Sequence, residues 1–239
     1  TLPSRLLNPL TSVLRELNEN YGVTFVFSTA TQPAFRKSQA LSEGFRAGEV
    51  DEIAGENQQV VTEQFQKLCR VEYRQAGTLD WAAMATLMAG RRQALCVVNV
   101  RRHAFALYEA LRGALPVGER GAMFHLSSAM CAEHRLQVLG EVRNPQVGTI
   151  RHRLLNGQPC WLVSTQVVEA GVDLDFPVVY RALGPLDSIV QAAGRCNREG
   201  RLTDEHGNPR LGEVFIFSPA DPVLPPGTYK TATAHAQSF

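Results

Sequence analysis

The most constraining feature of this 239-residue chain is a regular alternation of short apolar runs with amphipathic stretches, beginning near residue 60. The apolar runs predict strands at residues 69–74, 94–99, 122–126, 160–164, 178–182 and 213–218. The stretches between them predict helices at residues 78–89, 102–115, 132–142, 149–155 and 186–196. Apolar strands that alternate with helices are typical of a parallel sheet covered on both faces. We therefore predict one α/β domain over residues 60–218.

The first 59 residues follow a different pattern. Residues 3–19 predict an amphipathic helix, residues 23–28 predict an apolar strand, and residues 32–59 are polar with little periodicity. One helix and one strand cannot bury each other's apolar surface. We therefore predict that residues 1–59 are an αβ fragment of a preceding domain followed by a linker. Residues 219–239 begin with several prolines and predict a linker or tail.

Composition excludes several classes of protein. Apolar runs stop at about five residues, whereas a membrane-spanning helix needs about twenty, so we expect no membrane association. The five cysteines are widely spaced and form no C-x-x-C pair, which argues against a disulfide framework and a zinc site. We expect a cytoplasmic protein with no metal ligands. The net charge of +1 is too small for nucleic-acid binding by bulk charge, so any such contact must use a few placed groups.

The first informative motif, VSTQVVEAGVDLDF, covers residues 163–176. Its apolar strand ends at Ser164 and Thr165, and the carboxyl ends of strands are where open α/β sheets bind ligands. Gly171 permits a turn or a close backbone approach, and Asp173 offers a carboxylate to a ribose or a cation. The alternative is that the Ser-Thr pair only caps the next helix, as it does after many strands.

The second motif, QAAGRCNREGR, covers residues 191–201. Arg195 and Arg198 are three residues apart, a spacing that predicts one shared helical face. Two such guanidinium groups could hold a triphosphate. The alternative is a solvated basic helix end. Gln191 one turn earlier, Gly194 between them, and the strand-end motif upstream favour the phosphate site.

Together the two motifs resemble a known family. Q-x-x-G-R-x-x-R at residues 191–198, after S-T-Q-x-x-E-A-G-V-D at residues 164–173, resembles motifs VI and V of superfamily 2 helicases. The sequence of residues 164–201, which ends in GRCNREGR, closely resembles that of the CRISPR-associated helicase-nucleases that degrade DNA after a Cascade complex recruits them. FSTATQ at residues 27–32 resembles motif III, and CVVNVRRHA at residues 96–104 resembles motif IV. FHLSSAMCAEHR at residues 124–135 matches the segment that follows motif IV.

The resemblance implies a RecA-like fold and an ATP site. It implies that Arg195 and Arg198 reach the γ-phosphate of ATP, with Arg198 as the arginine finger and Gln191 beside them. Three residues would line the nucleotide cleft: Gly171, Asp173 and Gly194. The Mg²⁺ that accompanies ATP would be held by residues outside this chain.

The resemblance also implies contacts with single-stranded DNA. Three residues would hold phosphates of the tracked strand: Asn99, Val100 and Arg101. Three others would face the DNA backbone or couple it to the ATP site: Ser164, Thr165 and Gln166. Three residues would couple hydrolysis to DNA movement: Thr29, Ala30 and Thr31. His125 and Ser127 are weaker DNA candidates, because a histidine at a strand end is more often structural, and Glu169 would orient the backbone of motif V.

The chain also lacks parts that the family carries. It contains no G-x-x-x-x-G-K-[ST] loop, no D-E-x-x box precedes FSTATQ, and no His-Asp nuclease signature is present. We therefore expect residues 1–59 to end a first RecA-like domain and residues 60–218 to be the second. The expected partners are single-stranded DNA, a Cascade-type surveillance complex and the remainder of the helicase-nuclease. We expect the isolated chain to be inactive.

Two other functions remain open. The chain could be a non-catalytic docking or DNA- or protein-binding module derived from a helicase domain, although pure binding would not require Gln191, Arg195 and Arg198. A Rossmann-type small-molecule enzyme is disfavoured, because no strand is followed by a G-x-G-x-x-G turn.

Overall fold

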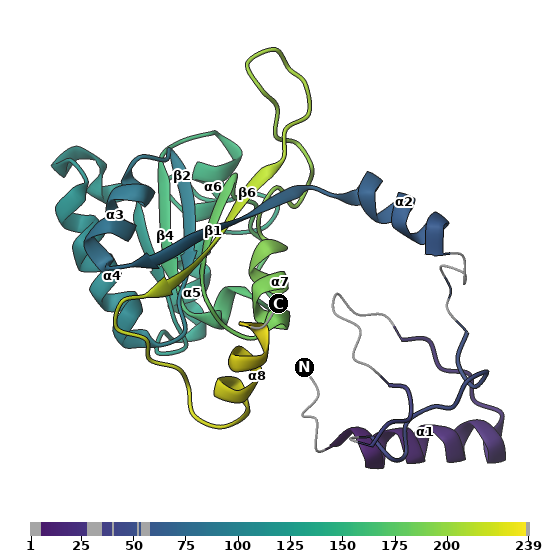
Figure 1. Ribbon diagram of the computed structural model, residues 1–239. Helices are drawn as coiled ribbons and strands as arrows, with labels where there is room; N and C mark the ends of the chain where they lie inside the picture. Colours follow the sequence, from purple (N-terminus) through teal and green to yellow (C-terminus); the bar gives the residue numbers. More distant parts are fainter. Residues whose placement is uncertain (1–5, 28–34, 40, 52, 54–57, 238–239) are drawn as a thin grey trace. The chain divides into compact units, whose positions relative to one another are not determined.

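The computed structural model describes residues 6–27, 35–39, 41–51, 53 and 58–237 (Figure 1). The chain divides into two compact units, Thr1–Cys69 and Arg70–Phe239. The boundary thus lies later in the chain than the one predicted after residue 59.

The first unit is built on helix α1 (Leu7–Tyr21). The helix ends at Gly22, which adopts a left-handed conformation with φ 65° and donates its backbone N–H to the Asn18 carbonyl. Arg15 of α1 contacts the 41–51 segment, where its guanidinium donates to the Gly44 carbonyl and pairs with Glu49. Helix α2 (Gln58–Leu68) ends the unit and was not predicted, although Val60, Val61, Phe65 and Leu68 recur at helical spacing.

The apolar strand predicted at residues 23–28 differs in the structure. Residues 23–27 form no ladder with any described residue. An isolated strand has no partner to satisfy its backbone groups, so β-forming composition alone does not produce a strand here. The assignment of residues 1–59 to a preceding RecA-like domain stays a prediction.

The second unit contains one six-stranded sheet with the order β1-β6-β5-β2-β4-β3. The strands are β1 (Val71–Leu79), β2 (Gln93–Val97), β3 (Met123–Leu126), β4 (Cys160–Ser164), β5 (Val178–Ala182) and β6 (Gly212–Pro219). Every strand pairing is parallel. The carboxyl ends of β2, β3, β4 and β5 therefore lie at one edge of the sheet and their amino ends at the opposite edge.

Helices cover both faces of this sheet (Figure 1). They are α3 (Trp81–Ala89), α4 (Arg101–Ala114), α5 (Ala132–Leu139), α6 (Ile150–Leu155) and α7 (Leu186–Ala193), with 3₁₀ turns η2 (Val117–Ala122) and η3 (Gln166–Val168). Within β2, Cys96 packs in the core with α3 and α4, whereas Leu95 and Val97 pack in the core with α5, α6 and α7. Successive strand residues point to opposite faces, so β2 is buried from both sides. The predicted RecA-like α/β sheet is confirmed.

The segment predicted as a linker or tail contains a further helix, α8 (Thr228–Ala236), which packs against α7. The hydroxyl of Thr233 is buried and donates to the Tyr229 carbonyl one turn earlier. The prolines at residues 219–226 precede the helix rather than interrupt it. This part of the chain is therefore attached to the domain, and its contacts bear on the site below.

Candidate nucleotide and DNA site

The carboxyl ends of β2 and β4 bring two of the sequence motifs together. The Val98 backbone N–H donates to the Ser164 carbonyl at 2.9 Å, which extends the ladder past the end of β2. The Gln166 side-chain amide then donates to the Asn99 carbonyl at 2.9 Å. Residues that resemble motif IV and motif V thus meet at one edge of the sheet.

Three predicted DNA contacts are nevertheless buried. Asn99 is 4% exposed, Ser164 0% and Thr165 5%. The Asn99 amide donates to the Leu183 carbonyl, and the Ser164 hydroxyl donates to the Leu126 carbonyl. Because Asn99 and Ser164 make these hydrogen bonds inside the protein, their side chains hold this edge of the sheet in place and do not reach solvent.

The accessible groups at this edge belong to helix α4. Arg101 and Arg102 are exposed in its first turn, and Val100 precedes the helix without a side-chain cap. The first backbone N–H groups of a helix attract anions because they lack partners within the helix. Arg101, Val100 and the half-buried Gln166 are therefore the predicted DNA contacts that can meet a phosphate.

A connecting segment, residues 165–177, crosses from this edge to the opposite one. It begins with η3 after β4 and ends at Phe176, which forms a parallel bridge with Cys196 just before β5. The Phe176 N–H donates to the Arg195 carbonyl at 2.8 Å, and the Asn197 N–H donates to the Phe176 carbonyl at 2.9 Å. The connecting segment thus joins the carboxyl end of β4 to the residues that resemble motif VI.

Arg195 lies against the middle of the connecting segment. Its guanidinium donates from Nε to the Val168 carbonyl and from Nη2 to the Glu169 carbonyl, both at 2.8 Å. Arg195 is 8% exposed, and burial lowers the pKa of its guanidinium. In this structure the group holds backbone and does not project toward solvent.

The expectation that Arg195 and Arg198 share a helical face is wrong. Helix α7 ends at Ala193, before either arginine, and Asn197 adopts a left-handed conformation with φ 44°. The left-handed residue lies between the two arginines, so they do not continue one helix. Arg195 therefore points into the domain, whereas the half-exposed Arg198 places its Nε 3.1 Å from the carboxylate of Asp173.

Asp175 holds the backbone of this turn. Its carboxylate accepts the N–H of Arg198 at 2.7 Å and the N–H of Glu199 at 3.1 Å. Asn197 adds further bonds, because its side-chain amide donates to the Arg70 and Arg210 carbonyls. These hydrogen bonds therefore fix the backbone position of Arg198.

The other candidates take intermediate positions. Gln191 is half-buried in the last turn of α7, and Gly194 is exposed as the residue after the helix. Gly171 is exposed on the connecting segment and has a positive φ of 72°, which favours glycine.

The three coupling candidates, Thr29, Ala30 and Thr31, lie outside the described residues. Ser127 is buried, and burial lowers the pKa of His125.

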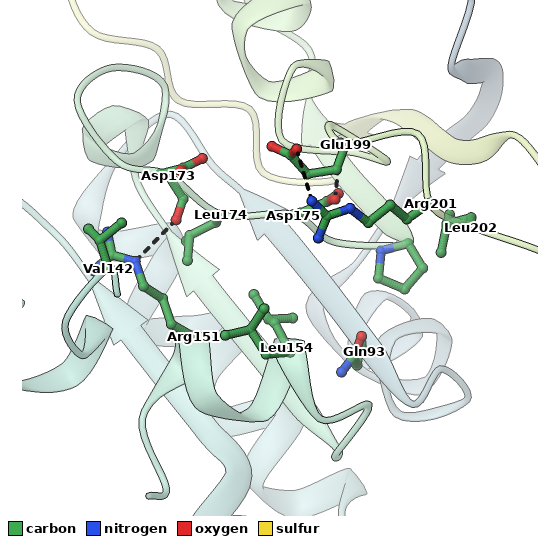
Figure 2. Close-up of a pocket in the computed structure, with 12 residues that line it drawn as sticks. Gln93, Val142, Arg151, Leu154, Asp173, Leu174, Asp175, Glu199, Arg201 and Leu202 are labelled. Carbon is green, nitrogen blue, oxygen red and sulfur yellow. Dashed lines mark hydrogen bonds and ion pairs between the residues drawn. The ribbon is translucent and has the colours of Figure 1, made fainter. Parts of the chain in front are cut away.

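A cavity of about 520 Å³ opens beside Asp173 and Asp175, near the amino ends of β2 and β5. Figure 2 shows Arg151 directed toward Asp173 and Arg201 directed toward Glu199. Carboxylates accept hydrogen bonds from hydroxyl groups but repel phosphate oxygens. The cavity lining combines the carboxylates of Asp173, Asp175 and Glu199 with the guanidinium groups of Arg151 and Arg201, and Arg198 lies next to it through its ion pair with Asp173.

Asp175→Ala is expected to destabilise the domain by about 1 kcal/mol, because two backbone N–H groups lose a charged acceptor that solvent only partly replaces. Urea unfolding of the chain measures the effect. Glu205→Ala, in the exposed segment before β6, is the matched control and should leave the midpoint unchanged. An unchanged midpoint for Asp175→Ala would show that the carboxylate does not hold the turn.

The described part of the chain yields two further negative findings. Its histidine, cysteine and acidic side chains form no group of three that could hold a metal ion. None of its helices has the length and apolar character needed to cross a membrane.

Sequence reasoning missed Asp175, Asn197 and Arg181. Arg181 had a visible signal, because a charged residue inside the apolar run VVYRA is exceptional for a buried strand. Asp175 and Asn197 had none that periodicity could detect, since both act through backbone groups brought together only by the fold.

The chain is similar to known proteins over part of its length. Residues 90–201 match the family model described as CRISPR-associated nuclease/helicase Cas3, C-terminal. The Cas3 nuclease/helicase of Haloferax volcanii is 53% identical over 64 residues, which cover 27% of this chain and 6% of that protein. A putative Cas3 of Methanocaldococcus jannaschii is 28% identical over 127 residues, covering 53% of this chain and 16% of that protein. The matches thus span less than a fifth of the length of these relatives.

Solved structures include similar chains. A crystal structure of a CRISPR-associated protein aligns with a TM-score of 0.48 and 25% identity, covering 69% of this chain and 18% of that one. The ADP complex of T. fusca Cas3 aligns with a TM-score of 0.46 and 19% identity, covering 66% and 20%.

The parallel sheet with helices on both faces has the α/β architecture expected of a RecA-like domain, and the two motifs resemble those of superfamily 2 helicases. Residues 90–201 are similar to the C-terminal region of Cas3 nuclease/helicases.

Proposed function

We propose that this chain works as part of an ATP-driven translocase that moves along single-stranded DNA during CRISPR interference. The first RecA-like domain, carrying the phosphate loop and the Mg²⁺ ligands, would complete the ATP site. The Cascade-type surveillance complex would deliver the DNA, and a nuclease would act on the unwound strand. The family match at residues 90–201 supports this assignment.

One observation carries the proposal. The accessible DNA candidates lie at the carboxyl edge of the sheet, and Asp173 and Arg198 lie near the amino end of β5. The connecting segment links the two places, and Arg195 holds its middle through two carbonyls. A movement at the ATP side can therefore reach the DNA side through one bonded segment.

ATP fits the residues that are present at the amino edge. The exposed carboxylate of Asp173 would accept hydrogen bonds from the ribose, and Gly171 and Gly194 leave room for a close approach. Arg198 would stabilise the charge that develops on the γ-phosphate, and Gln191 would lie beside it. Bound Mg²⁺ would neutralise part of the phosphate charge, with ligands from outside this chain.

The test joins residues 1–239 behind a RecA-like domain that carries the phosphate loop and acidic box of a Cascade-recruited helicase-nuclease. We expect the joined protein to hydrolyse ATP when single-stranded DNA is added, and the 239-residue chain alone to hydrolyse none. The phosphate-loop Lys→Ala variant of the added domain is the background control. DNA binding without DNA-stimulated hydrolysis by the joined protein would support the non-catalytic module instead.

A further inference from the structure

Arg181 is the most unusual buried residue of the domain. It is the next-to-last residue of β5, in the middle of the sheet, and it has no exposed surface. A buried guanidinium is tolerated only where acceptors and an opposite charge surround it. The identity of those partners therefore indicates what Arg181 does.

Besides the backbone carbonyls of Val97 and Ala182, Arg181 contacts side chains from three separate segments. Its Nη1 donates to the Asn99 side-chain oxygen at 2.8 Å, in the loop after β2. Its Nη2 donates to the Tyr229 hydroxyl at 2.8 Å, in helix α8, and lies 3.1 Å from the carboxylate of Glu169, in the connecting segment. One planar group thus contacts both motif-bearing segments and the C-terminal helix.

The Glu169 carboxylate balances the charge of Arg181. Burial raises the pKa of the Glu169 carboxyl, and the nearby guanidinium opposes that effect. The pair is almost fully buried, with side-chain exposures of 0% and 7%. Since the guanidinium fork is rigid, the pair holds the connecting segment at a defined place relative to β5.

Tyr229 continues the network from α8 to the candidate DNA edge. Its hydroxyl donates to the same Asn99 oxygen at 2.7 Å, and the Asn99 carbonyl accepts the Gln166 amide at 2.9 Å. A continuous series of hydrogen bonds therefore runs from α8 through Asn99 to Gln166.

Gly184 leaves the space that this network occupies. A Cβ at this position would lie 2.8 Å from the Tyr229 hydroxyl, 3.0 Å from Arg181 Nη2 and 3.3 Å from the Asn99 oxygen. The first distance is too short for a carbon atom and the second is tight, so a methyl group would displace the Tyr229 hydroxyl and crowd Arg181 Nη2. The absence of a side chain at Gly184 therefore leaves the space in which α8 contacts Arg181.

We propose that Arg181 is a positioning residue through which helix α8 sets the geometry of the DNA-contacting edge, namely Asn99, the first turn of α4 and Gln166. That this edge binds DNA rests on the proposed function, whereas the hydrogen-bonded connection between α8 and the edge does not. The position of α8, and of any structure attached to it, then determines whether the edge is ordered for DNA.

Tyr229→Phe tests the connection, because it removes one hydroxyl and its two hydrogen bonds from the network and leaves the ring. Amide hydrogen exchange of the chain should accelerate about tenfold at residues 98–102 and 165–169, since a lost hydrogen bond of this kind contributes about one power of ten to a local opening constant. Amides of β1 and α3 should be unchanged. Affinity for a short fluorescein-labelled oligo-dT should fall by a similar factor.

Two further variants sharpen the test. Gly184→Ala keeps every network side chain but displaces Tyr229, so it should reproduce the exchange pattern of Tyr229→Phe. Thr231→Ala changes an exposed neutral residue of α8 and should match the wild type. Unchanged exchange at both edge segments in the two network variants, or a uniform increase over the whole sheet, would overturn the positioning role. If the wild-type chain bound no oligo-dT, the proposed function would fail, while the exchange measurement would still decide whether the network of Arg181, Tyr229 and Asn99 connects α8 to this edge.

Discussion

Replacing Arg198 by alanine in the joined protein is expected to lower DNA-stimulated ATP hydrolysis by about 10³-fold or more, the usual contribution of an arginine finger. Arg198 is the arginine of motif VI that the structure leaves accessible, since Arg195 is buried against backbone. Its backbone is fixed by Asp175, so the guanidinium needs only a side-chain movement away from Asp173 to meet a phosphate. Steady-state phosphate release in the presence of single-stranded DNA measures the effect.

The control for this variant is Arg112→Ala, which removes an exposed arginine near the end of α4 with the same change of net charge. It should hydrolyse ATP at the wild-type rate. Oligo-dT binding should be unchanged in Arg198→Ala, because the residue lies near the amino end of β5, away from the candidate DNA edge. Hydrolysis by Arg198→Ala at the wild-type rate would show that the finger assignment is wrong.

Arg195→Ala is expected to act through stability as well as activity. The substitution leaves the Val168 and Glu169 carbonyls without their charged donor, and hydrogen bonds to a charged group contribute about 1.5–3 kcal/mol each. We expect a loss of about 3 kcal/mol in the free energy of unfolding of the chain, measured in urea. Arg198→Ala should change it by less than about 0.5 kcal/mol, as is usual for an accessible surface residue.

The comparison between these two variants separates two roles that the motif alone does not distinguish. If Arg195 were a phosphate ligand only, Arg195→Ala and Arg198→Ala would have equal stability and equal losses of ATP hydrolysis. A large drop in stability confined to Arg195→Ala supports the role that its two carbonyl contacts indicate. Arg195→Lys should recover little stability, since an ammonium cannot reproduce the paired donation of the guanidinium.

The central strands were predicted well because burial on both faces makes them continuously apolar. The predicted ranges for β4 and β5 agree with the structure. β1 was predicted too short, and its last residues were assigned to a helix. It lies at the edge of the sheet, pairs only with β6 among the described strands, and exposes most of its residues, so its sequence is polar. Hydrophobic periodicity has little to detect in such a strand.

The candidate site was predicted as a set of residues but not as an arrangement. Sequence spacing assigned Arg195 and Arg198 to one helix, whereas the left-handed Asn197 sends them in different directions. Likewise, Asn99 was expected to meet DNA, but its amide is used by Leu183, Arg181 and Tyr229. Tyr229 could not be included from the sequence, because the residues before α8 are rich in proline and resemble a linker.

The length of the connecting segment is fixed by the distance that it spans and by its points of attachment. The segment must cover the height of a five-residue strand, about 16 Å, and it is fastened at Gln166, Glu169 and Phe176. An inserted or deleted residue would move Asp173 away from Arg198. Related chains that keep this mechanism must therefore keep the number of residues in the connecting segment. The loop between Asn197 and β6 carries no such constraint at its tip, where a tight turn at Asp204 closes a short hairpin. Length variation among related chains should therefore collect at that tip, which also makes it the place to attach a fluorescent reporter.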